Sequence, residues 1–200
     1  MLRFAAIACF LLFAPTAQAS AAAIVGKPAP AFDAIDASGE LIRLDAFKGK
    51  YVVLEWVNFE CPFVGKHYGS GNMQELQKRY TEKGVVWLSI CSSAPGKQGH
   101  VTGEEAKELV TEREAVPTRF LLDPEGIVGK KYGAKTTPHI FVINPKGVLV
   151  YNGAIDDRPS TKRADIKGAK NYLTAALEST MAGKKVEIAA TQPYGCSVKY

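Results

Sequence analysis

Three cysteines, Cys61, Cys91 and Cys196, are the residues of this chain best suited to covalent chemistry. A fourth, Cys9, lies in an apolar run at the start of the sequence. Cys61 is followed directly by Pro62, and proline is favoured at the first position of a helix, where its missing N–H costs nothing. A cysteine at a helix N-terminus faces unpaired amides and the positive end of the helix dipole, and both stabilise a thiolate. We therefore predict that Cys61 is a nucleophile.

Charged neighbours of Cys61 can adjust its reactivity in either direction. The carboxylate of Glu60 opposes a thiolate, whereas Lys66 and His67 are close enough in sequence to favour one. The alternative is a buried, inert cysteine, but burial usually goes with apolar neighbours on both sides, and Glu60 and Pro62 do not fit that pattern. The residues alone leave the balance of these charges open.

A second sulfur for exchange with Cys61 is predicted in the C-terminal tail, at Cys196. The tail before it holds about 13 residues and can extend roughly 40 Å, whereas a domain of this size has a radius of gyration of about 15 Å. Gly195 allows a close approach of the backbone. Cys91, at the end of a predicted strand, is the competing partner. The tail also carries side chains typical of a docked segment rather than a frayed terminus: Pro193, Tyr194, Val198 and Tyr200.

Alternating strands and helices are predicted to position these cysteines. Continuous apolar runs at 51–57 and 85–91 indicate buried strands, and residues 72–84 between them indicate a helix with a capping box formed by Asn72 and Glu75. A strand, helix, strand unit of this kind favours parallel strands and a right-handed crossover.

The second half of the chain continues the alternation. Thr102 and Glu105 predict another capped helix, residues 120–123 a short strand, and residues 139–153 an antiparallel hairpin. A long helix is expected from about Ala164 to Ala182. This order predicts an α/β fold, a three-layer sandwich of the thioredoxin type with a mixed sheet between helices. We expect the domain to span 24–183 and the tail 184–200.

The first residues are typical of a secretory signal peptide at 1–19. Arg3 precedes an apolar run from Phe4 to Ala14, and small residues follow at 17–19. Pro15 ends the run well short of a membrane span, so we predict an exported, periplasmic or secreted protein without a membrane anchor after cleavage. Three remaining cysteines are an odd number for a purely structural framework and favour a reactive thiol. The formal net charge of +5 comes from scattered lysines, so no nucleic-acid partner is expected.

Several stretches resemble the peroxiredoxin-like redoxins, the alkyl hydroperoxide reductase and thiol-specific antioxidant group of the thioredoxin superfamily, and in particular a secreted or periplasmic branch. The resemblance implies a thioredoxin fold, a redox-active Cys61 and a cis proline at Pro138. In that architecture the loop before residue 139 faces the cysteine, so Thr137, Pro138 and Pro62 are candidates for substrate binding, with His139 as a neighbour. The stretches are residues 26–56, CPFVGKHYGSGNMQ (61–74), KTTPHIFVI (135–143), LVYNGAIDD (149–157) and YGCSVKY (194–200).

The sequence departs from these relatives at three positions. Val64 stands where a typical thioredoxin has the second cysteine of its CxxC motif, so dithiol exchange within the motif is excluded. Leu54 and Asn58 stand where a typical peroxiredoxin has a proline and a Thr or Ser before its reactive cysteine. Asn58 can still donate a hydrogen bond, so peroxidase activity is weakened rather than excluded.

These observations predict a thiol oxidoreductase in which Cys61 attacks a disulfide or a peroxide and Cys196 resolves the intermediate. Protein or small-molecule disulfides, or peroxides, are the expected substrates, with an external thiol as reductant and no metal or organic cofactor required. One alternative is a one-cysteine peroxidase. Another is a non-catalytic binding or metallochaperone module in which Cys61 and His67 hold Cu(I), a metal that favours thiolate ligands.

Overall fold

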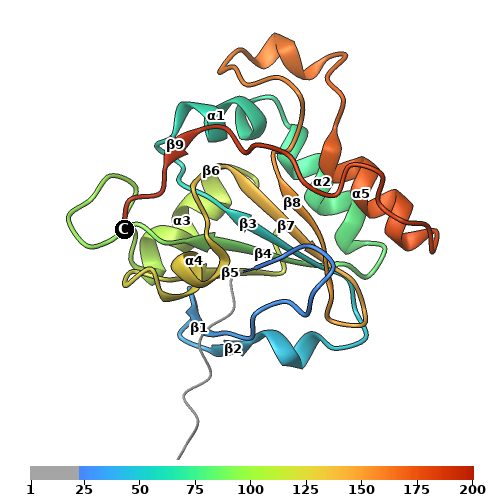
Figure 1. Ribbon diagram of the computed structural model, residues 1–200. Helices are drawn as coiled ribbons and strands as arrows, with labels where there is room; N and C mark the ends of the chain where they lie inside the picture. Colours follow the sequence, from blue (N-terminus) through green and yellow to red (C-terminus); the bar gives the residue numbers. More distant parts are fainter. Residues whose placement is uncertain (1–22) are drawn as a thin grey trace, which may run out of the picture.

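A seven-stranded mixed sheet in the order β2-β1-β5-β4-β3-β7-β8 forms the centre of the molecule (Figure 1). The computed structural model describes residues 23–200, so the predicted signal peptide at 1–19 and Cys9 lie outside the described residues. The central strands β3 (Val52–Trp56) and β4 (Val86–Cys91) are parallel neighbours, as predicted. Strand β5 (Arg119–Leu122) is parallel to β4, while β7 (His139–Ile143) is antiparallel to β3 and continues into β8 (Leu149–Gly153).

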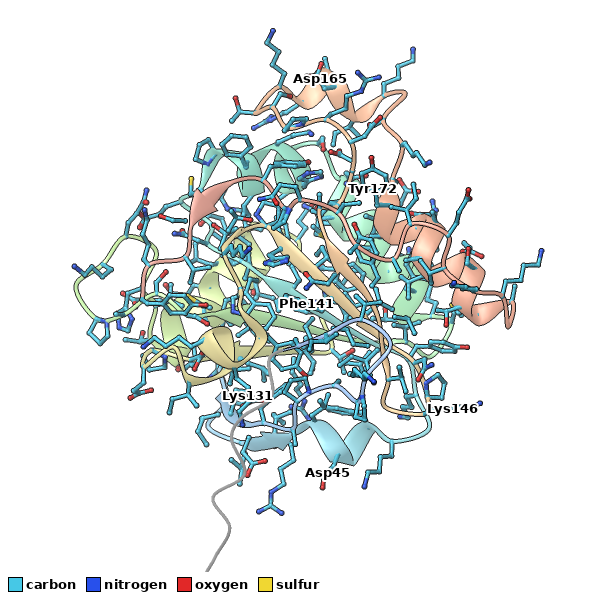
Figure 2. All side chains as sticks on the ribbon, viewed as in Figure 1. Asp45, Lys131, Phe141, Lys146, Asp165 and Tyr172 are labelled. Carbon is cyan, nitrogen blue, oxygen red and sulfur yellow. The ribbon has the colours of Figure 1, made fainter. Side chains whose placement is uncertain are left out.

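Helices cover both faces of this sheet and confirm the predicted thioredoxin-like sandwich. One face packs against α1, α2, α3 and α5, and the other against α4 and the N-terminal segment. Figure 2 shows Phe141 at the centre of the sheet, whereas Lys131 and Lys146 lie toward the periphery. The helices are α1 (Pro62–Gly69), α2 (Asn72–Thr81), α3 (Gly103–Glu112), α4 (Ile127–Tyr132) and α5 (Tyr172–Met181).

Of the two predicted capping boxes, one is confirmed and the other is wrong. At the start of α3 the Thr102 side chain accepts from the Glu105 N–H and the Glu105 carboxylate accepts from the Thr102 N–H. At the start of α2 the cap is Gly71, in the left-handed conformation with φ 75°. The Asn72 side chain turns instead to a ring nitrogen of His67, at 2.9 Å. The spacing of a capping box is present, but the Asn72 side chain bonds the preceding helix α1 instead of the backbone of α2.

The long helix predicted from about Ala164 to Ala182 is confirmed in its second half, which is α5, and wrong in its first half. A short 3-10 helix covers Arg163–Ile166, and Gly168 with φ 82° then ends the helical run. Helix α5 begins only after Asn171, whose side chain accepts from the Thr174 N–H at 2.8 Å. The sequence interpretation also missed α4 and the N-terminal hairpin of β1 (Asp33–Asp36) and β2 (Leu41–Arg43).

The C-terminal tail runs back across the domain after α5 and reaches the start of α1 (Figure 1, red). Ala190 bridges to Asn152 of β8. Further along, β9 (Cys196–Ser197) pairs antiparallel with β6 (Thr136–Thr137). Gly195 has φ 138°, and a Cβ at this position would lie 2.1 Å from the Thr137 carbonyl oxygen, so only glycine fits the approach. Within residues 23–200, every helix is too short or too polar to cross a membrane.

Candidate active site

Cys61 occupies the position between β3 and α1 that was predicted from the Cys-Pro pair. It is the N-cap residue of α1, and Pro62 is the first residue of the helix. The carbonyl oxygen of Cys61 accepts from the Gly65 N–H at 2.8 Å, which begins the helical ladder. The side chain has 0% exposure. The expectation that Glu60 and Pro62 would keep Cys61 out of the interior is therefore wrong, because distant segments of the chain cover it.

Three segments that are far apart in sequence meet at the Cys61 sulfur. Cys61 Sγ donates a hydrogen bond to the Thr137 carbonyl oxygen at 3.0 Å. The Thr137–Pro138 peptide bond is cis, as the resemblance implied. Thr137 is also the residue of β6 that pairs with Cys196 of β9. The first helical turn, the cis-proline loop and the tail therefore meet at Thr137, which bonds Cys61 through its carbonyl group and pairs with Cys196 across the strands.

The two cysteines influence each other's acidity in opposite directions. Burial raises the pKa of Cys61, but hydrogen bonds to its sulfur from the Cys196 thiol and the Val64 N–H outweigh burial and hold the pKa below its ordinary value. Burial, the hydrogen bond to Cys61 and the negative charge on that sulfur raise the pKa of Cys196 to about 11. Of the two thiols Cys61 is therefore the more acidic, and it loses its proton before Cys196 does.

Cys91 lies at the end of β4, as expected, and has different surroundings. Its thiol donates to the Gly99 carbonyl oxygen at 3.2 Å. Burial raises its pKa. The side chain borders a cavity of 170 Å³ that is also lined by Asn58, Arg113 and Phe120. These contacts are those of a protonated cysteine at the edge of the core.

Lys66 and His67, which the sequence offered as possible activators of Cys61, are directed elsewhere. The Lys66 ammonium group forms a buried ion pair with Asp156 at 3.2 Å. Both ring nitrogens of His67 are engaged, one by Asn72 at 2.9 Å and the other by the hydroxyl of Tyr194 at 3.0 Å. The copper alternative required Cys61 and His67 as a pair, and this histidine has no free nitrogen for a metal. No cluster of three potential metal ligands occurs in residues 23–200.

His139 and Asn58 also have structural partners. The Nδ1 atom of His139 accepts from the Lys135 N–H at 3.2 Å, and its Nε2 atom bonds Asn152 at 2.7 Å. Burial lowers the pKa of His139 to about 4, so its ring is neutral at pH 7. Asn58 donates to the Gln98 carbonyl oxygen and accepts from the Glu60 N–H. Its amide oxygen and one of its two amide protons are therefore engaged within the protein.

The polar contacts of Tyr194 near the site were not predicted from the sequence. Tyr194, two residues before Cys196, contacts Lys66, His67 and Asp156 through its hydroxyl group. The sequence indicated only that the tail around Cys196 is apolar enough to dock. Its spacing gave no sign that a lysine on α1 would be buried beside an aspartate about ninety residues away.

The sequence matches the AhpC/TSA family over residues 25–152. The thiol-disulfide oxidoreductase ResA of Bacillus thuringiensis subsp. konkukian (strain 97-27) is 29% identical over 126 residues, which cover 63% of this chain and 67% of that protein. Neither match reaches the whole chain, and the family match ends before the tail that carries Cys196.

Solved structures extend the similarity to most of the chain. A hypothetical protein, SMc02350, from Sinorhizobium meliloti 1021 is 26% identical with a TM-score of 0.75, covering 88% of this chain and 94% of that chain. An uncharacterised conserved protein from Geobacillus kaustophilus is 27% identical with a TM-score of 0.75, covering 89% and 93%. A putative thiol:disulfide interchange protein DsbE from Chlorobium tepidum is 24% identical with a TM-score of 0.54, covering 77% and 98%, and it supports the fold alone.

Proposed function

Because the chain belongs to the AhpC/TSA family, we propose that it is an exported thiol-disulfide oxidoreductase with Cys61 as nucleophile and Cys196 as resolving cysteine. The main support is the shared position of the two cysteines at the Thr137 carbonyl, one by a hydrogen bond and the other by strand pairing. The opposite shifts in their pKa values add to it. The name of ResA supports a disulfide as substrate.

The proposed reaction has two exchange steps. The Cys61 thiolate attacks one sulfur of a substrate disulfide, a mixed disulfide forms, and the other substrate sulfur leaves as a thiolate. Cys196 then loses its proton to solvent or to the leaving group and attacks Cys61 Sγ. The second substrate sulfur leaves, and the Cys61–Cys196 disulfide remains. The substrate is reduced by two electrons and the protein is oxidised by two, so an external thiol must reduce the protein again.

The electrostatics of the pair order these two steps. While Cys61 is a thiolate, its charge and its hydrogen bond help to raise the pKa of Cys196 to about 11, which keeps the second thiol protonated. Once Cys61 is bound in a mixed disulfide, that charge is gone, and only burial, the largest cause of the raised pKa of Cys196, still acts on this thiol. Cys196 is therefore a better nucleophile after the first step than before it.

The substrate is proposed to contact Pro62 and the cis-proline loop at Thr137 and Pro138. Because the tail covers Cys61, which has 0% exposure, a protein disulfide reaches the sulfur only after β9 separates from β6. A peroxide is the second candidate substrate and is favoured by the family match. The missing Thr or Ser hydroxyl at position 58, and the engagement of the Asn58 oxygen and of one of its amide protons, favour the disulfide. Steady-state turnover of a protein disulfide and of hydrogen peroxide by the same preparation compares the two.

The acidity of Cys61 gives a direct test of the nucleophile. Since thiolates react and thiols do not, the alkylation rate of Cys61 by iodoacetamide is expected to rise with pH around a midpoint below that of an ordinary cysteine. Cys91 and Cys196 should label only at higher pH, because burial raises both pKa values. Peptide mapping after timed alkylation of the reduced protein measures all three. If the alkylation of Cys61 has a pH midpoint at or above that of Cys91, the assignment of Cys61 as the nucleophile is wrong.

Export is proposed from the pattern of Arg3, the apolar run and the small residues at 17–19. An exported thiol oxidoreductase works in an oxidising compartment, where disulfides persist as substrates and products. Intact-mass analysis of the protein from the envelope of its native host is expected to show a chain that begins near Ser20. A product that retains Met1 would contradict export by cleavage.

A further inference from the structure

The tail is attached to helix α1 through Tyr194, two residues before Cys196. The Tyr194 ring packs against Phe63 of α1 with ring centroids 5.9 Å apart. Its hydroxyl group reaches Lys66, one turn further along the same helix, at 3.2 Å. Cys61 is the N-cap of the same helix, so α1 carries both Lys66, which anchors the tail, and Cys61, which Cys196 must meet.

The Tyr194 hydroxyl binds to a buried ion pair formed by Lys66 and Asp156. Lys66 has 0% side-chain exposure and its partner Asp156 has 2%. The ammonium group has four acceptors within reach: the two carboxylate oxygens of Asp156 at 3.2 and 3.4 Å, the Arg158 carbonyl oxygen at 2.6 Å and the Tyr194 hydroxyl at 3.2 Å. Burying two charges is costly unless their hydrogen bonds are made. The tail supplies one of these acceptors, the Tyr194 hydroxyl.

The hydroxyl of Tyr194 also makes all the hydrogen bonds available to it. It donates to Asp156 Oδ1 and accepts from Lys66. Because the Asn72 amide donates to Nδ1 of His67, the proton of the neutral ring lies on Nε2, which donates to the same hydroxyl at 3.0 Å. One phenol group thus satisfies a lysine, an aspartate and a histidine that come from two other segments of the chain.

We propose that Lys66, Asp156 and Tyr194 form a latch that positions Cys196 against Cys61 and sets how often the tail opens. The proposal rests on the proposed function, in which Cys196 resolves the intermediate on Cys61. Opening removes one hydrogen-bond partner from each charge of a buried pair, so the closed tail is favoured. A closed tail raises the effective concentration of Cys196 at Cys61. These three are positioning residues, because they act through Cys196 and not on the substrate.

The variant Tyr194→Phe tests the latch because it keeps the ring on Phe63 and removes only the hydroxyl. Tail opening is measured in the fully reduced protein by hydrogen exchange of residues 192–200, whose Val198 N–H donates to the Lys135 carbonyl oxygen at 3.0 Å. We expect exchange about tenfold faster than in wild type. In glutathione buffers, the equilibrium constant for forming the Cys61–Cys196 disulfide should fall about tenfold as well.

Tyr51→Phe is the matched control, since it removes a hydroxyl that donates to the Thr180 carbonyl oxygen at 2.9 Å, away from the latch. It should change neither measurement. The double variant Lys66→Met with Asp156→Leu replaces the pair by apolar side chains and should also speed exchange of the tail. Unchanged tail exchange in Tyr194→Phe, or an equal effect of Tyr51→Phe, would overturn the latch. Faster tail exchange in a protein whose wild type forms no Cys61–Cys196 disulfide would support the latch and reject the resolving role.

Discussion

Replacing Cys61 with serine is expected to lower the turnover of a protein disulfide by about a thousandfold or more, because a serine hydroxyl is not ionised at neutral pH and cannot attack a disulfide. The site offers no second thiol in the first turn of α1, where Val64 occupies the position two residues after Pro62. Reduction of insulin by the full mature chain, with a thiol reductant in excess, measures this loss.

Cys91→Ser is the matched control for that experiment. The Cys91 thiol donates to the Gly99 carbonyl oxygen, and a serine hydroxyl can make the same bond. We expect its turnover to stay within about twofold of wild type, because the substitution removes little side-chain volume and keeps a hydrogen-bond donor at this position. A large loss in Cys91→Ser together with a small loss in Cys61→Ser would move the nucleophile to β4 and overturn the assignment.

The second large effect concerns stability. Asp156→Asn is expected to reduce the free energy of unfolding by about 3–5 kcal/mol, because it leaves the buried Lys66 without the charge that compensates it. Urea denaturation at pH 7 measures this loss. The control is Asp33→Asn, which breaks an ion pair with Arg43 whose side chains are 59% and 61% exposed. That change should cost less than about 1 kcal/mol, as exposed pairs usually do.

The double variant Lys66→Met with Asp156→Leu separates charge from packing. Replacing both members of a buried pair by apolar side chains of similar size is often neutral, so most of the stability lost in Asp156→Asn should return. A double variant as unstable as the single one would mean that the shape of the site, and not the unpaired charge, carries the effect. A loss below about 1 kcal/mol in Asp156→Asn would mean that the pair is hydrated in solution.

The parts of the site that depend on neighbouring residues in the sequence, namely the two central strands and the start of α1, were predicted correctly. The continuous apolar runs around Val53 and Leu88 indicated the two central strands, and the Cys61–Pro62 pair indicated the start of a helix. Each of these depends on residues within one turn or one strand of each other. The thioredoxin-like order of elements followed from them.

Predictions failed where a contact with a different element decides the local structure. Asn72 has the spacing of a helix cap, but its side chain bonds His67 and the chain enters α2 through Gly71. Cys61 has polar and imino-acid neighbours typical of an exposed position, yet the tail buries it. Lys66 would be exposed on an isolated helix and is buried only because Asp156 and Tyr194 meet it. None of these contacts leaves a periodic signal in the sequence.

The second sulfur of the proposed reaction, that of Cys196, comes from the C-terminal tail and not from the helix that carries Cys61. In a CxxC motif both cysteines share one helical turn, so their separation is fixed by the helix. Here Cys61 is fixed by α1 and Cys196 is held by β9 and the Tyr194 contacts. The proximity of the two sulfurs therefore depends on the docking of a segment that can separate, and substrate access and resolution both depend on that equilibrium.

Non-reducing peptide mapping of the oxidised wild-type protein tests the central claim most directly. The protein is oxidised with a stoichiometric small-molecule disulfide, blocked with an alkylating agent, digested and analysed by mass spectrometry. The account predicts a crosslink between the peptides of Cys61 and Cys196, an alkylated Cys91, and in Cys196→Ser a mixed disulfide that persists on Cys61. A crosslink between Cys61 and Cys91, or release of the mixed disulfide at the wild-type rate in Cys196→Ser, would contradict it.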